Sequence, residues 1–355
     1  MRWSLVIATV VLCACTPTQP AEPAPRSTTS SPPRVVPTTP APEAQPEPPS
    51  EISLTVVGDL MFSRGVAAAH PDPTSTLRGL QPLLRGADVT VGNLESTLST
   101  AGAPTQGGDS FGASPQVLAG LRRAGFDALS LANNHTGDYG ETALVQTVEA
   151  FEGSGISPFG AGRDLAQATR PAIIERDGVS VGFLGFNAIG ETPQAAPGRP
   201  GALSVRMPPR TGPLNTGDLR HVLRAIRRLD ARVDAVVVLP HWGEQYTHVP
   251  WPSQRIVGRR LVDAGADLVV GGHPHWVQGL ERHRGVTIAH SLGNAVFDMD
   301  FAEQTMEGVV LTATVSARGV DDIDLAPYRM DASFTPHLVH GAAAREILGD
   351  VRSGR

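Results

Sequence analysis

The sequence predicts an α/β fold in which strands and helices alternate over most of the chain. Two observations favour it: short β-branched, apolar runs recur between residues 52 and 330, and stretches of helical periodicity separate most of them. A third observation is that small polar clusters follow the apolar runs, as happens at the carboxyl ends of strands in open α/β sheets.

The predicted strands are apolar runs bounded by turn-forming residues. They cover residues 52–57, 88–93, 127–132, 179–186, 234–240, 267–272, 286–291, 307–315 and 322–330. The predicted helices place apolar residues three and four positions apart. They cover residues 114–124, 142–152, 217–229 and 253–264. The last two strands have no helix between them, so we expect them to be antiparallel.

The first residues are typical of an exported lipoprotein. Arg2 precedes an apolar segment from Ser4 to Leu12, which is too short to span a bilayer. Leu12-Cys13-Ala14-Cys15 resembles a lipobox with Cys15 as the lipidated residue, and the alternative is an ordinary signal peptide with incidental cysteines. We therefore predict a lipoprotein signal peptide over residues 1–14 and an extracytoplasmic protein anchored to the membrane through lipid.

A proline-rich segment follows. Residues 16–50 hold 12 of the 31 prolines and no aromatic residue, so they cannot bury enough apolar surface to fold. We expect residues 15–50 to be a disordered tether and residues 51–330 to be one folded domain. Residues 331–355 are expected to form a C-terminal tail, either a short helix or a frayed end.

Charge excludes several functions. The chain has no lysine, so all 29 basic residues are arginine, and neither a Schiff base nor a P-loop lysine is available. The net charge of −6 argues against a general nucleic-acid binder. We therefore expect no nucleic-acid partner.

Polar clusters follow five of the predicted strands. They are Gly58-Asp59, Asn93-Leu94-Glu95, Asn133-Asn134-His135, Pro240-His241-Trp242-Gly243 and Gly271-Gly272-His273-Pro274-His275. Because ligands bind beyond the carboxyl ends of such strands, we expect carboxylates, an asparagine and histidines to meet at one edge. These donors suit Mn, Zn or Fe, so the sequence predicts one or two divalent metal ions.

Each cluster alone also has an ordinary structural explanation. Gly-Asp after a strand is commonly a turn or helix cap, and asparagine-rich loops commonly hydrogen-bond their own backbone. The His273-Pro274-His275 step is more specific, because two imidazoles two residues apart after a glycine pair can face one centre. Five clusters in succession favour a functional site.

Six motifs carry a family resemblance over about residues 52–300. They are GDLMFSRG (58–65), GNLES (92–96), LANNHTGDYG (131–140), HWGEQY (241–246), GGHPHWVQG (271–279) and HSLGNAVFD (290–298). Together they resemble the CapA family of poly-γ-glutamate capsule proteins, a branch of the calcineurin-like metallophosphatase superfamily. The resemblance implies a four-layer α/β/β/α sandwich of the metallo-dependent phosphatase type.

The resemblance also implies roles for particular residues. Asp59 and His275 would bind a first metal, with Asp59 also counted as catalytic, and Glu95 would bridge. Asn134, His241 and His273 would bind a second metal. His135 would be the general acid or would orient the substrate. Met61 stands where the family pattern usually has a histidine ligand, so we expect the second metal position to be better occupied than the first.

Other residues near the motifs are candidates for substrate contact. Trp242 and Trp276 each follow a proposed ligand and could form a platform for a polymer, or could simply pack the edge of the site. Arg64 could bind a carboxylate or phosphate, or could be a surface residue. Asn294 is a candidate hydrogen-bond partner of a metal ligand.

Three functions remain open at this point. The first is a metal-dependent hydrolase or transferase in the synthesis, export or anchoring of an anionic envelope polymer such as poly-γ-glutamate, within a capsule-synthesis membrane complex. In this function His135 would protonate the leaving group of an amide or phosphoester. The second is a plain metallophosphoesterase. The third is a non-catalytic accessory protein that binds the polymer.

Overall fold

The computed structural model describes Leu12 and residues 50–353. The remaining signal-peptide residues, Cys15 and the tether up to residue 49 lie outside the described residues. Among the helices that are described, none is long and apolar enough to cross a membrane.

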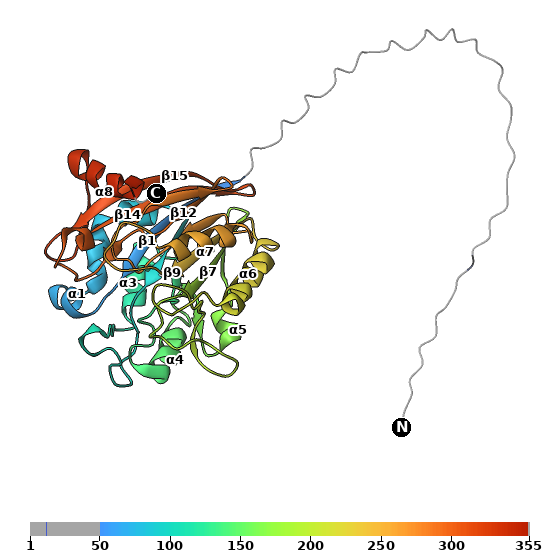
Figure 1. The fold of residues 1–355 in the computed structure, drawn as a ribbon, viewed down its shortest axis with the longest axis horizontal. Helices are drawn as coiled ribbons and strands as arrows, with labels where there is room; N and C mark the ends of the chain where they lie inside the picture. Colours follow the sequence, from blue (N-terminus) through green and yellow to red (C-terminus); the bar gives the residue numbers. More distant parts are fainter. Residues whose placement is uncertain (1–11, 13–49, 354–355) are drawn as a thin grey trace, which may run out of the picture. The chain divides into compact units, whose positions relative to one another are not determined.

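Two large sheets form the centre of the domain (Figure 1). The first has eight strands in the order β16-β15-β14-β1-β2-β3-β4, with β13 paired to β1, and the second has six in the order β11-β12-β10-β9-β7-β6. The first sheet contains β1 (Glu51–Leu60), β2 (Val89–Leu94), β3 (Ala128–Ser130), β4 (Ser157–Phe159), β13 (Asn294–Val296), β14 (Glu307–Ser316), β15 (Gly319–Met330) and β16 (Pro336–Leu338). The second contains β6 (Ala172–Arg176), β7 (Val179–Asn187), β9 (Ala235–His241), β10 (Leu268–Val270), β11 (Leu280–His283) and β12 (Val286–Ala289). A small two-stranded sheet joins β5 (Ala161–Gly162) and β8 (Gly201–Ala202).

The helices connect the strands. They are α1 (Arg64–Ala69), α2 (Gln81–Gly86), α3 (Val117–Ala124), α4 (Gly140–Ala150), α5 (Leu165–Ala168), α6 (Thr216–Asp230), α7 (Pro252–Val262) and α8 (Gly341–Ser353). The described residues also form the short 3-10 segments η1 (Pro73–Gly79), η2 (Gly107–Asp109) and η3 (Glu303–Met306). Helix α6 is stabilised at its N-terminus by Asn215, whose side chain accepts hydrogen bonds from the first free backbone N–H groups. Its apolar face is buried against the sheet.

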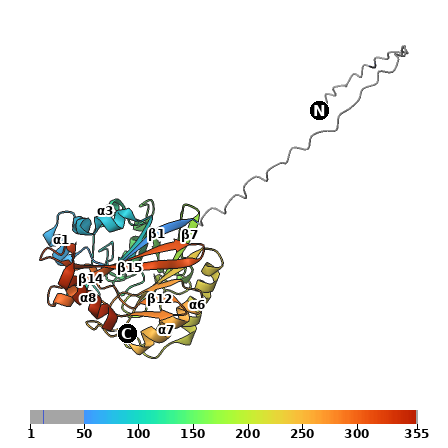
Figure 2. The same ribbon diagram turned by 90° about the horizontal axis from the view of Figure 1, so that it is seen from above.

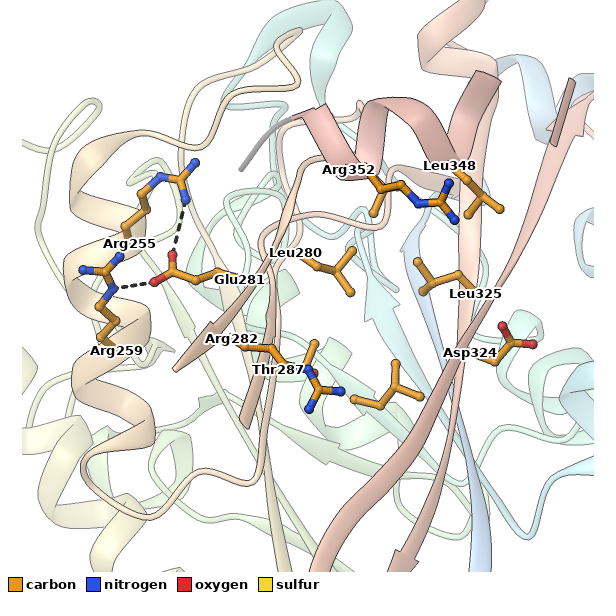
Figure 3. Close-up of a pocket in the computed structure, with 12 residues that line it drawn as sticks. Arg255, Arg259, Leu280, Glu281, Arg282, Thr287, Asp324, Leu325, Leu348 and Arg352 are labelled. Carbon is orange, nitrogen blue, oxygen red and sulfur yellow. Dashed lines mark hydrogen bonds and ion pairs between the residues drawn. The ribbon is translucent and has the colours of Figure 1, made fainter. Parts of the chain in front are cut away.

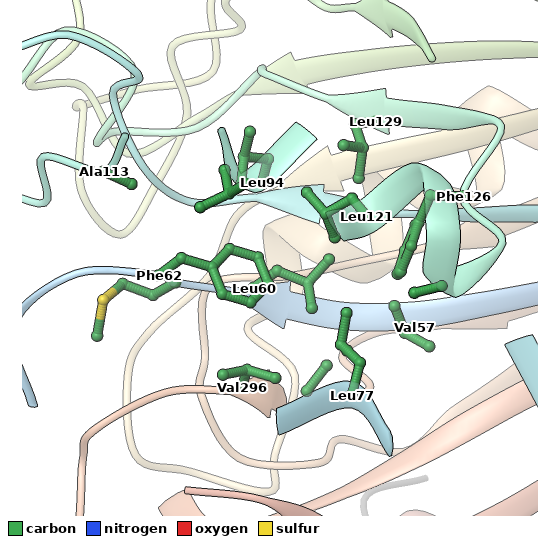
Figure 4. Packing of buried hydrophobic residues seen from close by; sticks show 14 of the residues in the cluster. Val57, Leu60, Phe62, Leu77, Leu94, Ala113, Leu121, Phe126, Leu129 and Val296 are labelled. Carbon is green, nitrogen blue, oxygen red and sulfur yellow. The ribbon is translucent and has the colours of Figure 1, made fainter. Parts of the chain in front are cut away.

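Three apolar cores separate four layers. In the first, Leu60 of β1 and Leu94 of β2 pack against Leu121 of α3 (Figure 4). The second lies between the sheets, where the inward residues of β1 face those of β7 and β9. The third packs α6 and α7 on the outer face of the second sheet. Figure 2 shows α1 and α3 on one side of the sheets and α6 and α7 on the other. The predicted four-layer α/β/β/α sandwich is therefore confirmed.

Strand direction brings distant motifs together. Strands β1, β2, β3 and β4 run parallel in the first sheet, and β7, β9, β10 and β12 run parallel in the second. Their carboxyl ends meet at one edge of the sandwich, where the isolated pairing of His241 with Gly272 continues the second sheet. Asp59 lies opposite Asn93 in the first sheet.

The domain continues beyond residue 330. Strand β16 pairs with the end of β15, and Ile347 and Val351 of α8 are buried in the core between the sheets. Of the two conformations expected for the C-terminal residues, the helix forms because its apolar residues find this core, and the boundary expected at residue 330 moves to the end of α8.

Candidate metal centre

Six predicted ligands converge at the carboxyl edge of the two sheets. Each comes from a strand end or the loop after it, and each side chain is buried. They are Asp59, Glu95, Asn134, His241, His273 and His275. Buried charged and polar groups are costly unless they are paired or bind metal, so this concentration requires a compensating partner.

Two groups of donors share one carboxylate. Glu95, His241 and His273 place ligand atoms within 4.8 Å of one another, and so do Asp59, Glu95 and His275. Oε1 of Glu95 lies 3.6 Å from Nε2 of His241. Glu95 therefore belongs to both groups and could serve a cation in either. We call the Asp59–Glu95–His275 group position one and the Glu95–His241–His273 group position two.

Asn134 lies beside position two and could add an oxygen donor to it. Its Oδ1 lies 2.9 Å from Nε2 of His241, and its Nδ2 donates to Oε2 of Glu191 at 2.8 Å. Because the amide nitrogen is held by Glu191, the amide oxygen faces the histidine. Nothing in the sequence pattern had identified Glu191, whose left-handed backbone (φ 63°) belongs to an irregular loop after β7.

Three buried donor atoms of this centre lack hydrogen-bond partners among the described residues. They are Oε1 of Glu95 and both ring nitrogens of His273. An unpaired buried carboxylate oxygen or imidazole costs free energy, about 1–3 kcal/mol for each neutral group. Carboxylate and imidazole are suitable ligands for Mn, Zn or Fe, so the residues present fit divalent cations.

Burial and neighbouring charges shift the pKa values of several groups in the site. Burial opposes ionisation of Glu95, but His241, His275 and His135 outweigh it and bring the Glu95 pKa to about 2. Burial and the nearby Glu95 charge raise the pKa of Asp59. Burial and the neighbouring histidines hold the pKa of His273 well below its ordinary value, which keeps this imidazole neutral and able to bind a cation.

The loop after β10 aims its two imidazoles at different positions. His273 and His275 both have left-handed backbones (φ 94° and 57°), which are strained conformations for residues with a Cβ. The backbone N–H of His273 donates to Oδ2 of Asp59 at 3.0 Å. A Cβ on Gly272 would lie 2.5 Å from Oδ1 of Asp59, so glycine is required for this close approach.

His135 follows Asn134 but its ring turns to other partners. Its Nδ1 lies 2.8 Å from Oδ2 of Asp138, and its Nε2 lies 3.7 Å from Oε1 of Glu95. The ring stacks on Phe111 with centroids 3.9 Å apart. The Asp138 carboxylate accepts from Nδ1–H, so Nε2 faces Glu95. Asp138 was missed by the sequence analysis, although its place three residues after His135 in the third motif was a usable signal.

Asn294 touches the histidine of position one. Its Oδ1 lies 2.8 Å from Nδ1 of His275, and its Nδ2 donates to the carbonyl of Thr305 at 2.9 Å. This arrangement fixes the ring orientation, and the same Nδ1 lies 3.8 Å from Oδ2 of Asp59. Met61 lies elsewhere: its side chain belongs to the apolar core below the site, and its sulfur accepts from Ser63.

Two predicted substrate residues have other partners. Trp242 is fully buried, and its Nε1 donates to the carbonyl of His290 at 3.0 Å, so the prediction that it contacts substrate is wrong. Apolar packing against α6 and α7 decides its position. Arg64 is bound to Asp298 and Asp109 and lies over the Phe111 ring, so it acts as a structural clamp and is not a free anion-binding group.

The exposed aromatics near the site are different residues. Tyr246 is 39% exposed and Phe301 is 64% exposed, and their rings meet edge to face at 5.2 Å. Tyr246 also stacks on His275 at 6.2 Å. Trp276, the other predicted platform residue, is half-buried beside His248. Nothing in the fourth motif indicated that Tyr246 would be exposed while Trp242 would be buried.

The fold and these donors define a four-layer α/β protein whose buried carboxylate–histidine cluster could hold metal ions. The chain belongs to the bacterial capsule synthesis protein family PGA_cap, whose model matches residues 53–299. The family resemblance seen in the six motifs is thereby confirmed.

Named relatives agree with this membership. The "Capsule biosynthesis protein CapA" of Bacillus anthracis is 30% identical over 315 residues, which cover 86% of this chain and 74% of the relative. The "PGA biosynthesis protein CapA" of Bacillus subtilis is 28% identical over 282 residues, covering 78% of this chain and 71% of the relative.

Solved structures resemble the chain at low sequence identity. A crystal structure described as a novel phosphatase from Mycoplasma pneumoniae has a TM-score of 0.47 and 14% identity, covering 79% of this chain and 94% of the other. A hypothetical protein from Thermus thermophilus has a TM-score of 0.48 and 16% identity, covering 78% and 99%. Both scores are below 0.5, so the fold described here rests on the layers and strand order themselves.

Proposed function

We propose that this protein is a metal-dependent hydrolase or transferase acting on an anionic cell-envelope polymer such as poly-γ-glutamate during its synthesis, export or anchoring. The observation that carries this proposal is the sharing of Glu95 by two groups of donors, with Nε2 of His135 3.7 Å from the same carboxylate. The names of the two relatives, which refer to capsule and PGA biosynthesis, support the choice of polymer.

The chain's own residues divide the chemical work. Asp59, Glu95, Asn134, His241, His273 and His275 would hold one or two divalent ions, which would supply Lewis-acid polarisation of a carbonyl or phosphoryl oxygen. As water or an acceptor group bonds to the carbonyl carbon or phosphorus, His135 would give a proton to the leaving nitrogen or oxygen, and the scissile bond would break. Asp138 holds Nδ1 of His135, so the proton would be transferred from Nε2.

A pair of variants tests this division. His135→Ala should retain the metal content of the wild type and lose roughly 10²–10⁴-fold in kcat, because a positioned general acid supplies about that factor. His241→Ala should lose metal as well as activity. The measurements are elemental analysis and steady-state rates on γ-glutamyl amides and on phosphate esters, each with and without added Mn²⁺.

The same assays can contradict the proposal. Equal metal loss in both variants would make His135 a ligand or a structural support. Full activity of His135→Ala on every substrate would remove it from catalysis. Turnover confined to phosphate esters would replace the amide chemistry by that of a phosphoesterase.

The membrane location is also part of the proposal. Cys15 is the last residue of the lipobox-like sequence, and a lipid on it would hold the domain at the extracytoplasmic face near a capsule-synthesis complex. Cys15→Ser should abolish lipid labelling and release the protein from membranes. Unchanged membrane retention of this variant in cell fractionation would exclude lipid anchoring at Cys15.

A further inference from the structure

A groove away from the metal centre lies between the two sheets, bounded by α7 and α8 (Figure 3). Its volume is about 710 Å³. One wall carries β11 and α7, and the other carries β15 and α8. Neither the motifs nor the proposed metal chemistry uses any of these residues.

The groove runs along two unpaired strand edges. Leu280, Glu281 and Arg282 are consecutive in β11, and consecutive residues of a strand point to opposite faces, so a cavity lined by all three lies at the edge of the strand. β11 is the outermost strand of its sheet. The same reasoning applies to residues 323–325 of β15, because β16 covers β15 only at Tyr328–Met330. Unpaired strand edges present backbone N–H and C=O groups to an extended chain.

The groove is apolar at its floor and cationic at its rim. Leu280, Leu325 and Leu348 are partly buried, and the first two face each other across the opening (Figure 3). The lining residues include four arginines and two carboxylates, which leaves an excess of positive charge. The arginines are Arg255, Arg259, Arg282 and Arg352, and the carboxylates are Glu281 and Asp324.

The charges are not all internally paired. Glu281 is bound by Arg255 and Arg259. His290 also contacts Glu281, and it and Arg259 bring the Glu281 pKa to about 2, so this carboxylate stays ionised and paired. Within residues 50–353, no carboxylate forms an ion pair with Arg282 or Arg352, and Arg282 bonds only the Gly285 carbonyl. Two cations are therefore available on opposite walls.

We propose that this groove binds an extended γ-linked glutamate chain at a site separate from the metal centre, which deepens the proposed function and rests on it for the choice of polymer. The chemistry matches at three points: amide groups of the chain pair with the strand edges, its methylenes cover the leucine floor, and its carboxylates meet Arg282 and Arg352. A lipid tail lacks the amides, and inorganic phosphate lacks both amides and methylenes.

The test measures binding of a fluorescent γ-linked glutamate oligomer to the full-length chain in detergent. The Arg282→Ser/Arg352→Ser double variant should bind up to about 25-fold more weakly, since each exposed charge contact contributes up to about fivefold. Asp324→Asn should bind about twofold to fivefold more tightly, because it removes a like charge. Arg260→Ser is the matched control: Arg260 is exposed on α7 next to Arg259 but does not line the groove, so binding should be unchanged.

Competition distinguishes the ligand. Unlabelled γ-linked oligomer should displace the probe, whereas α-linked glutamate of equal length, phosphate and anionic lipid micelles should displace it at least about tenfold less well. The proposal would be overturned if the wild type did not bind the probe, or if the double variant bound it as tightly as the wild type. It would also be overturned if any of those three competitors displaced the probe as well as the γ-linked oligomer does. Circular dichroism of each variant checks that the fold is retained.

A metal-site variant separates this inference from the proposed function. His273→Ala should lose metal, and adding Arg282→Ser/Arg352→Ser to it should weaken oligomer binding by the same factor as in the wild type. If the wild type bound no metal and had no activity, but the arginine variants still lost oligomer affinity, the groove would stand and the proposed chemistry would fail. If activity required metal but the arginine substitutions left oligomer binding unchanged, the proposed chemistry would stand and the groove proposal would fail.

Discussion

The two candidate metal positions differ in whether their histidine rings have a hydrogen-bond partner. At position one, Nδ1 of His275 is held by Asn294 at 2.8 Å, so the ring is oriented before any ion arrives. At position two, neither ring nitrogen of His273 has a partner among the described residues. The bond to Asn294 fixes the ring orientation and tautomer of His275, whereas a cation would be the first polar partner of the His273 ring.

The donor sets differ in the opposite sense. Position two has the Glu95 carboxylate, two imidazoles and the Asn134 amide oxygen, whereas position one has Asp59, Glu95 and a single imidazole. Orientation therefore favours position one, while the number of donors favours position two. The contrast shows that motifs indicate how many donors a position has, but do not indicate whether hydrogen bonds already orient those donors.

The largest effect is expected from His273→Ala. This change removes an imidazole from position two, leaving Glu95, His241 and Asn134, and should weaken metal binding there by more than about 100-fold, which exceeds the 10–100-fold typical of losing an outer partner. Elemental analysis after dialysis should show fewer metal equivalents than the wild type. His337→Ala, a histidine on the surface of β16, is the control and should retain all metal. Full metal content in His273→Ala would mean that position two does not use this ring.

An intermediate effect is expected from Asn294→Ala at position one. The His275 ring would lose the partner that fixes it, and metal affinity there should fall by about 10–100-fold. Tyr328→Phe is a matched control. The Tyr328 hydroxyl donates to the Asn294 main-chain carbonyl at 2.8 Å, so this substitution removes a bond to Asn294 but does not change the Asn294 side chain. Titration calorimetry with Mn²⁺ separates them. Equal losses in both variants would point to a general loosening of β13.

The smallest effect is expected from Met61→Leu. The Met61 side chain packs with Phe62 in the core between the first sheet and its helices, so a volume-conserving change should cost less than about 1.5 kcal/mol of unfolding free energy. Metal content should be unchanged at both positions. Denaturant unfolding and elemental analysis measure the two outcomes. A specific loss of metal from position one would show that the thioether contributes there after all.

Much of the fold follows from local patterns in the chain. The apolar run at 52–57 became β1 and the run at 234–240 became β9, because a near-continuous run of β-branched and other apolar residues suits a strand that is buried on both faces. The helical spacing at 217–229 became α6. Strands β4 and β6 were not predicted, since three and five residues of mixed character carry little periodicity.

The position of the ligands could also be predicted. Residues that directly follow parallel strands reach one edge whatever the connecting helices contain, so Glu95, Asn134 and His241 had to lie near one another once the strands were identified. That reasoning uses only backbone direction. It does not depend on which side chains pack between the elements.

Tertiary structure alone decided what neighbouring side chains do. Trp242 and Tyr246 belong to one motif, yet the first is buried under α7 and the second stacks on His275, because distant segments determine which ring finds a core. His135 and Asn134 are adjacent in the sequence, yet the His135 ring bonds to Asp138 while the Asn134 side chain bonds to His241. The groove depends on the edges of β11 and β15, which lie in different sheets. Periodicity is a property of the local backbone, whereas burial and charge pairing depend on residues brought together only by folding.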